Sequence, residues 1–129
     1  MQQQSQAGVI WLKFAIVYLM LGVAMGIAMG ASQNFTMRPV HAHVNLLGWT
    51  TLALAGLIYS VFPKAGGSKL AKVHFWLMNL SLPAMMVSLM LVLTGHLVAV
   101  AVPVLVSAEL VAALAIIAFA ANLFLNLKA

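Results

Sequence analysis

The sequence contains no cysteine and very little charge. Its 129 residues include six lysine or arginine side chains and one acidic side chain, and 65% of the residues are hydrophobic. Without cysteine the chain cannot form disulfides, iron–sulfur clusters, thiolate metal sites or thioether bonds to haem. A soluble domain of this size would need roughly a quarter of its residues charged. The sequence therefore predicts an integral membrane protein whose main contact is the lipid bilayer.

The basic residues are dispersed along the chain. The net charge is +5, but no element concentrates it. A nucleic-acid-binding protein carries its basic residues as a patch or a stripe. We therefore expect no nucleic-acid partner.

Four apolar runs are each long enough to cross a hydrocarbon core of ~30 Å. We expect spans at about 9–31, 40–62, 73–94 and 96–124, within a single domain that covers 1–129. The connections are short, so successive helices must be antiparallel neighbours. The predicted fold is all-α, a four-transmembrane-helix up-down-up-down bundle.

The lysines indicate the orientation of this bundle, because an even number of spans brings all of them to one side. They are Lys13, Lys64, Lys69, Lys72 and Lys128. The positive-inside rule places this side in the cytoplasm, together with both termini. The predicted location is therefore the cytoplasmic membrane of a bacterium or archaeon. Trp11, Tyr59 and Trp76 are expected to form an interfacial belt on the same side.

Three of the four histidines are predicted to meet at the outer end of the bundle. His41 and His43 begin the second span there, and His96 lies in the third connection, which is also outer. His74 begins the third span on the opposite side, where an interfacial role is expected. Ionisable side chains at membrane depth are costly, and their presence is a functional hypothesis by default. The pattern indicates a haem or metal site at the outer end.

Helix geometry narrows the choice of ligand. His41 and His43 point ~200° apart, so only one of them can face the bundle interior. His41 shares its face with Asn45 and Gly48, and a small residue there would leave room for a flat macrocycle. His96 is the remaining histidine at this depth. Two imidazoles from separate helices are the usual axial ligands of a b-type haem. We therefore predict a non-covalent haem b bound by His41 and His96.

Other polar residues have open roles. His43 would donate a hydrogen bond near the haem, contact a propionate or bind a separate metal. Arg38 is either a propionate partner or a solvated loop charge. Glu109, the single acid, lies near the middle of the fourth span. It is either a proton relay or quinol-binding group, or a neutral acid that is hydrogen-bonded to Asn79 or Ser107.

Small residues and a proline indicate local structure. Gly22, Gly26 and Gly30 repeat every fourth residue in the first span. This small-xxx-small face predicts close helix contact, within the bundle or between protomers. Pro39 suits the first helical position, where its missing N–H has no cost.

The segment Arg38-Pro39-Val40-His41 resembles the second helix of the haem–copper oxidase catalytic subunit. The resemblance is to the branch of high-affinity terminal oxidases and nitric oxide reductases, and it implies that His41 is an axial ligand of a low-spin haem. The longer string from His41 to Trp49, His-Ala-His-Val-Asn-Leu-Leu-Gly-Trp, is similar to small four-helix membrane proteins labelled as oxidase subunit I-like. The resemblance further implies one four-helix arc of the oxidase, a homo-oligomer, and a quinone or respiratory redox partner.

The oxidase subunit has further spans and a second histidine cluster that holds copper, and this chain has neither. The resemblance therefore does not extend to reduction of oxygen or nitric oxide by a single chain.

Three functions are compatible with these residues. The first is a membrane b-type haem protein for electron transfer, or for sensing a gas or a redox state. The second is a haem-free copper or zinc protein that uses His41, His43 and His96, although the two neighbouring rings diverge on a regular helix. The third is a structural or assembly subunit of a respiratory complex with interfacial histidines.

Overall fold

The computed structural model describes residues 6–127, and in that range the chain is helical without strands. The three long helices are α1 (Gln6–Ser32), α5 (Lys69–Thr94) and α6 (Val98–Asn126). A further long stretch is divided into α2 (Arg38–His43), η1 (Val44–Thr51) and α3 (Leu52–Val61). The short helix α4 (Pro63–Gly66) precedes α5. The prediction of an all-α chain is confirmed.

Four helical stretches are long and apolar enough to cross a membrane, as the sequence predicted. They are Gln6–Ser32, Arg38–Val61, Lys69–Thr94 and Val98–Asn126. The third begins earlier than expected, because the Ser68 hydroxyl accepts a hydrogen bond from the Ala71 N–H at 3.0 Å and caps α5. The fourth begins at Val98 rather than at residue 96, because Gly95 and Leu97 have left-handed backbone conformations and form a turn.

The middle of the second span is a π-helix, whereas regular helical geometry was expected. A π-helix has hydrogen bonds between residues five apart, so each turn contains more residues. In η1 the Thr51 hydroxyl also donates to the Leu46 carbonyl oxygen at 2.8 Å. Side chains four positions apart then lie nearly on one face of the helix, and every fourth residue of this stretch is buried. The buried positions are Val40, Val44, Gly48 and Leu52.

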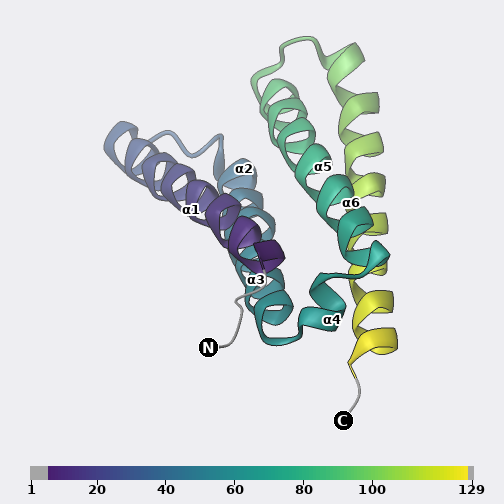
Figure 1. The fold of residues 1–129 in the computed structure, drawn as a ribbon. Coiled ribbons are helices and arrows are strands. Elements are labelled where there is room, and N and C mark those ends of the chain that lie inside the picture. The colour runs from purple at the N-terminus through teal and green to yellow at the C-terminus, as the bar shows by residue number, and fades with distance from the viewer. Residues whose placement is uncertain (1–5, 128–129) are drawn as a thin grey trace.

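Figure 1 shows two antiparallel helical hairpins. The first pairs α1 with the second span, and the second pairs α5 with α6. The Ser32 end of α1 points away from α5 and α6, so α1 packs mainly on the second span. The connection through α4 joins the hairpins at the end that carries Lys64 and Lys72. The predicted order of antiparallel neighbours therefore holds, but α1 diverges from the rest of the bundle.

Close packing between α5 and α6 depends on small residues. The buried face of α6 consists mostly of alanines: Ala101, Ala108, Ala112, Ala115 and Ala118. Small side chains let helix backbones approach closely, which favours association where no water is available to drive it. The alanine face therefore lets α5 and α6 pack closely along this hairpin.

Candidate functional site

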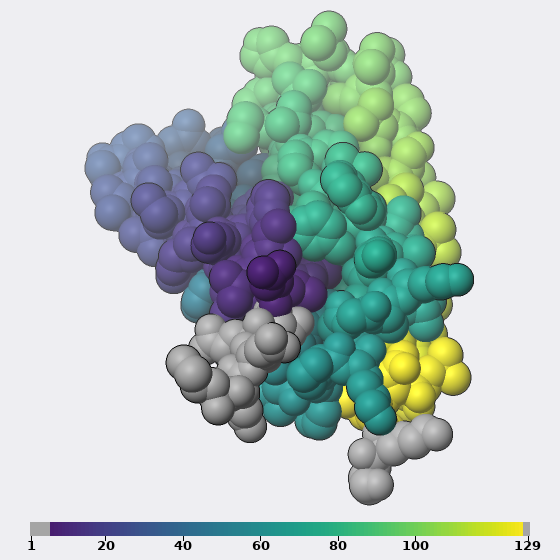
Figure 2. Space-filling view, in the orientation of Figure 1, coloured from purple at the N-terminus to yellow at the C-terminus, as the bar shows by residue number. Residues whose placement is uncertain are grey.

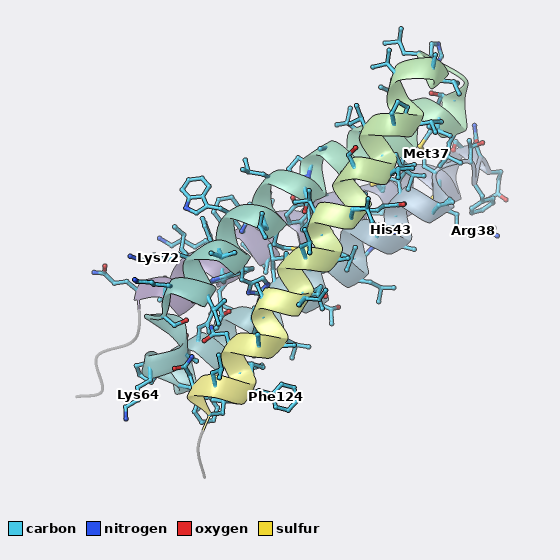
Figure 3. The ribbon with its side chains drawn as sticks, turned by 90° about the vertical axis from the view of Figure 1, so that its right-hand side faces the viewer. Met37, Arg38, His43, Lys64, Lys72 and Phe124 are labelled. Carbon is cyan, nitrogen blue, oxygen red and sulfur yellow. The ribbon has the colours of Figure 1, made fainter. Side chains whose placement is uncertain are left out.

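The second span begins at the end of the molecule opposite Lys64 and Lys72, and Figure 3 shows Arg38 and His43 there. Pro39 lies in the first turn of α2, as predicted. Arg38 is exposed, and its guanidinium lies 5.3 Å from the centre of the Phe35 ring. This cation–π contact holds the guanidinium at the surface of the turn before α2.

His41 is half-buried and faces α1. A β-carbon at Gly26 would lie 3.2 Å from the imidazole Cε1, so the ring packs directly on this glycine. The Asn45 side-chain amide donates to the His41 carbonyl oxygen at 2.8 Å and lies 3.3 Å from its Nδ1. Because the amide nitrogen is a donor, Nδ1 accepts, and the neutral His41 ring carries its proton on Nε2.

The glycines of α1 make the close helix contact that the sequence predicted. A β-carbon at Gly22 would lie 2.5 Å from the Asn45 Oδ1, so this glycine accommodates the asparagine as Gly26 accommodates His41. Gly30 meets nothing within 4 Å and does not share this role. Two of the three glycines in the repeat therefore contact candidate site residues: Gly22 contacts Asn45, and Gly26 contacts His41.

The room expected beside Gly48 is absent. A β-carbon there would lie 2.5 Å from the ring of Tyr18, which therefore fills the space. The expectation that Gly48 leaves a gap for a macrocycle is wrong, because α1 places an aromatic ring in it. His41 is half-buried against α1, whereas Val40 and Val44 on the same span are buried.

His43 is half-buried next to the buried stripe of the second span, two positions after His41. Its Nδ1 lies 2.7 Å from the Pro39 carbonyl oxygen. A carbonyl oxygen only accepts hydrogen bonds, so Nδ1 carries the proton and the lone pair lies on Nε2. This is the tautomer in which histidine ligates a metal through Nε2 while its other nitrogen is oriented by a carbonyl.

His96 is exposed on the turn between α5 and α6, outside the contacts that hold His41 and His43. Its backbone N–H donates to the Leu91 carbonyl oxygen at 2.9 Å and terminates α5. A pocket of about 400 Å³ at this end of the molecule does not include any of the three histidines. Its lining residues are Ala28, Met29, Ser32, Asn34, Thr36, Met37 and Thr94.

Within residues 6–127, no group of three histidine or acidic side chains could hold a metal ion. The structure therefore brings His41 together with Asn45, and leaves His96 apart from them.

His74 is completely buried, and the expectation of an interfacial histidine there is wrong. Its ring lies between Trp11, at a centroid distance of 4.4 Å, and Phe119, at 4.7 Å with an interplanar angle of 25°. Trp11 and Tyr59 are buried beside it, so their predicted place in an interfacial belt is also wrong. Trp76 is 61% exposed, as a belt residue should be.

A chain of hydrogen bonds surrounds His74. The Asn122 amide nitrogen donates to the Ala65 carbonyl oxygen at 3.0 Å and to the Tyr59 hydroxyl at 3.3 Å. Because the Tyr59 hydroxyl accepts from Asn122, it donates its own hydrogen to Nδ1 of His74, at 2.9 Å. The Asn122 side-chain oxygen Oδ1 accepts a hydrogen bond from the Ser68 hydroxyl at 2.8 Å. The imidazole proton is thereby assigned to Nε2, a buried atom without a partner among the described residues.

The sequence did contain a signal for this cluster. Tyr59, His74 and Asn122 are polar residues of three different spans, and the antiparallel order places all three near the lysine-rich end. Their depths agree, but a prediction of contact also needs the rotation of each helix about its axis. The sequence instead predicted a site at the opposite end, where His41, His43 and His96 were expected to meet.

Glu109 lies on the exposed surface of α6. Its two expected partners bind elsewhere: the Asn79 amide donates to the Phe75 carbonyl oxygen at 2.9 Å, and the Ser107 hydroxyl donates to the Pro103 carbonyl oxygen at 2.8 Å. The expected hydrogen bonds of Glu109 to these two side chains are therefore wrong. Its role as a proton relay or quinol-binding group stays a prediction.

No protein-family model, curated protein or solved structure matches this chain. The resemblance of Arg38-Pro39-Val40-His41 to the haem–copper oxidase subunit stays a prediction from the sequence.

Proposed function

We propose that this chain is a small integral membrane protein that binds a b-type haem non-covalently through His43 and transfers electrons near the outer membrane face. The observation that carries the proposal is the hydrogen bond between Nδ1 of His43 and the Pro39 carbonyl oxygen, at 2.7 Å. It leaves the Nε2 lone pair free for an axial bond to iron. The adjoining π-helix supports the proposal, since π-helical turns are frequent at functional sites.

The donor set fits a haem better at His43 than at His41. Asn45 leaves the neutral His41 ring with its proton on Nε2, so that nitrogen has no lone pair for iron unless the amide moves. The face of His41 is also occupied, by Gly26 directly and by Tyr18 further along at Gly48. These contacts reverse the preference that helix geometry alone suggested.

The remaining residues have defined roles in this proposal. His96 would supply the second axial ligand, from the same chain or from a second copy, and a vacant sixth position would favour gas sensing instead. Arg38 is exposed at the same end, and its guanidinium would pair with a propionate. A bound haem supplies one-electron transfer. The Pro39 carbonyl oxygen orients His43 as the iron ligand, and the bilayer would exclude water from the side of His43 that faces the membrane interior.

A visible spectrum of the detergent-purified protein, reduced minus oxidised, tests the proposal directly. We expect a sharp low-spin α band that is lost in His43→Ala, because this change removes the ligand. His41→Ala is the matched control, since it removes an imidazole two positions away, and the band should persist there. His96→Ala should convert the spectrum to a high-spin form that binds carbon monoxide.

Two results would contradict the proposal. A band that survives His43→Ala and disappears in His41→Ala would return the ligand to His41. A protein that stays colourless when haem is supplied during expression would exclude haem and leave the two other functions. Metal analysis would then separate them. Within residues 6–127, a copper or zinc site could not be formed by three histidine or acidic side chains alone.

A further inference from the structure

A pocket of about 280 Å³ lies between the start of α1 and the start of α5, at the lysine-rich end of the molecule. These two segments adjoin on the face shown in Figure 2. The pocket is open on one side, and its lining includes Ile10, Trp11, Gly67, Lys72, Phe75 and Trp76. It is separate from the outer-end histidines, and the proposed function does not use it.

Three aromatic side chains line the pocket and contact one another. Trp11 and Phe75 make an edge-to-face contact, with ring centroids 5.4 Å apart and planes at 85°. Phe75 contacts Trp76 in the same way, at 5.6 Å. Trp11 is buried, whereas Ile10 and Trp76 are 44% and 61% exposed. The pocket thus has a buried inner wall at Trp11 and an exposed apolar rim at Ile10 and Trp76.

The charge at the rim is of one sign. Lys72, in the first turn of α5, lines the pocket and is exposed. Lys69 at the start of α5 and Lys64 in α4 are exposed at the same end of the molecule. The single acidic residue of the sequence, Glu109, lies in the middle of α6 and cannot reach this end. No acidic side chain of residues 6–127 therefore neutralises these lysines. At the end of a membrane span, anionic lipid headgroups are the available counter-charge.

We propose that this pocket binds an anionic phospholipid. The phosphate lies at Lys72, and an acyl chain extends along Ile10 and Trp76 towards the membrane interior. The apolar rim favours a hydrocarbon tail, and the adjacent Lys72 favours an anionic head, so the pocket suits a ligand that has both. Neither a free anion nor a neutral lipid would satisfy both.

Quenching of tryptophan fluorescence by brominated lipids tests this site, because two of the three tryptophans line it. The protein, carrying Trp49→Phe to remove the distant tryptophan, is placed in bilayers that contain brominated phosphatidylglycerol or brominated phosphatidylcholine. We expect the phosphatidylglycerol to be preferred about fivefold, the factor that one lysine near an anionic lipid contributes. Lys72→Gln should remove the preference, and Lys72→Arg should keep it.

Lys64→Gln is the matched control, because it removes the same charge from the same end of the molecule at a residue that does not line the pocket. It should leave the preference unchanged. Equal quenching by the two lipids in the unchanged pocket would overturn the proposal. So would an equal loss in Lys64→Gln and Lys72→Gln, which would indicate diffuse attraction. Inorganic phosphate, added at constant ionic strength, should not relieve the quenching; relief would mean that the site binds the free anion.

Discussion

Two histidines separated by a single residue have different capacities as ligands because of their nearest neighbours. The Pro39 carbonyl oxygen accepts a hydrogen bond from Nδ1 of His43, while the Asn45 amide donates one to Nδ1 of His41. Nothing in the residue types alone distinguishes the two imidazoles. The difference depends on which side chain reaches which nitrogen, and this choice follows from the local backbone.

At the residue scale, the hydroxyl of Tyr59 should be a main support of the buried cluster. It accepts from Asn122 and donates to His74, so Tyr59→Phe leaves two buried polar groups without this partner. We expect a loss of about 1–3 kcal/mol in the free energy of unfolding, the cost of unsatisfied buried polar atoms. Denaturant titration in mixed micelles measures it.

Tyr18→Phe is the control for this change. Tyr18 is half-buried, and its hydroxyl has no hydrogen-bond partner within residues 6–127. Its removal should change the free energy of unfolding by less than about 0.5 kcal/mol. Equal losses in the two variants would show that the Tyr59 hydrogen bonds do not contribute to stability.

The sequence predicts residue identities at this scale better than their surroundings. Pro39 was placed correctly because its preference is local. His74 was misplaced because burial depends on where the rings of Trp11 and Phe119 lie, and those belong to other helices. Interactions between residues far apart in the chain have no periodicity from which they could be predicted.

At the scale of elements, the second span combines a regular helix with a π-helix. His41 and His43 lie in α2, before the π-helix begins, and point ~200° apart as on any regular helix. In the structure neither is inside: the buried stripe runs through Val40 and Val44, and both histidines are half-buried beside it. The π-helical hydrogen bonds of η1 continue this stripe, and the hydrophobic pattern did not indicate them.

The glycines of α1 provide a sharp test of helix packing. Gly8 abuts the second span, where a β-carbon would lie 2.6 Å from the Gly56 carbonyl oxygen, which is backbone and cannot rotate away. Gly8→Ala should therefore force the helices apart and cost about 1–3 kcal/mol. Gly30 has no neighbour within 4 Å. Gly30→Ala should be neutral or stabilise the protein by up to about 1 kcal/mol, through helix propensity.

Thermal unfolding of both glycine variants in detergent measures this difference. Replacing glycine by alanine raises helix propensity in both variants. The difference in stability between Gly8→Ala and Gly30→Ala therefore reports the contact between α1 and the second span. A Gly8→Ala protein as stable as Gly30→Ala would show that the two helices do not approach as closely as the structure has them.

At the scale of the whole molecule, composition and hydropathy are sufficient to predict the number of spans. Four apolar runs became four helices, with ends shifted by a few residues where Ser68 caps α5 and where Gly95 turns. The divergence of α1 could not be predicted, because lipid solvates the exposed side of a span as readily as a neighbouring helix does. Polar contacts such as Tyr59 to His74 therefore define where the hairpins meet.

The orientation of the molecule in the membrane is the last prediction, and the absence of cysteine makes it simple to test. Three lysines follow the second span, whereas Arg38 is alone before it, so the positive-inside rule places residue 63 in the cytoplasm and residue 36 outside. Both positions are exposed. A membrane-impermeant maleimide should label Thr36→Cys in intact cells, and Pro63→Cys only after permeabilisation. The cysteine-free parent should not react, and the reverse pattern would place the histidines of the second span on the cytoplasmic side.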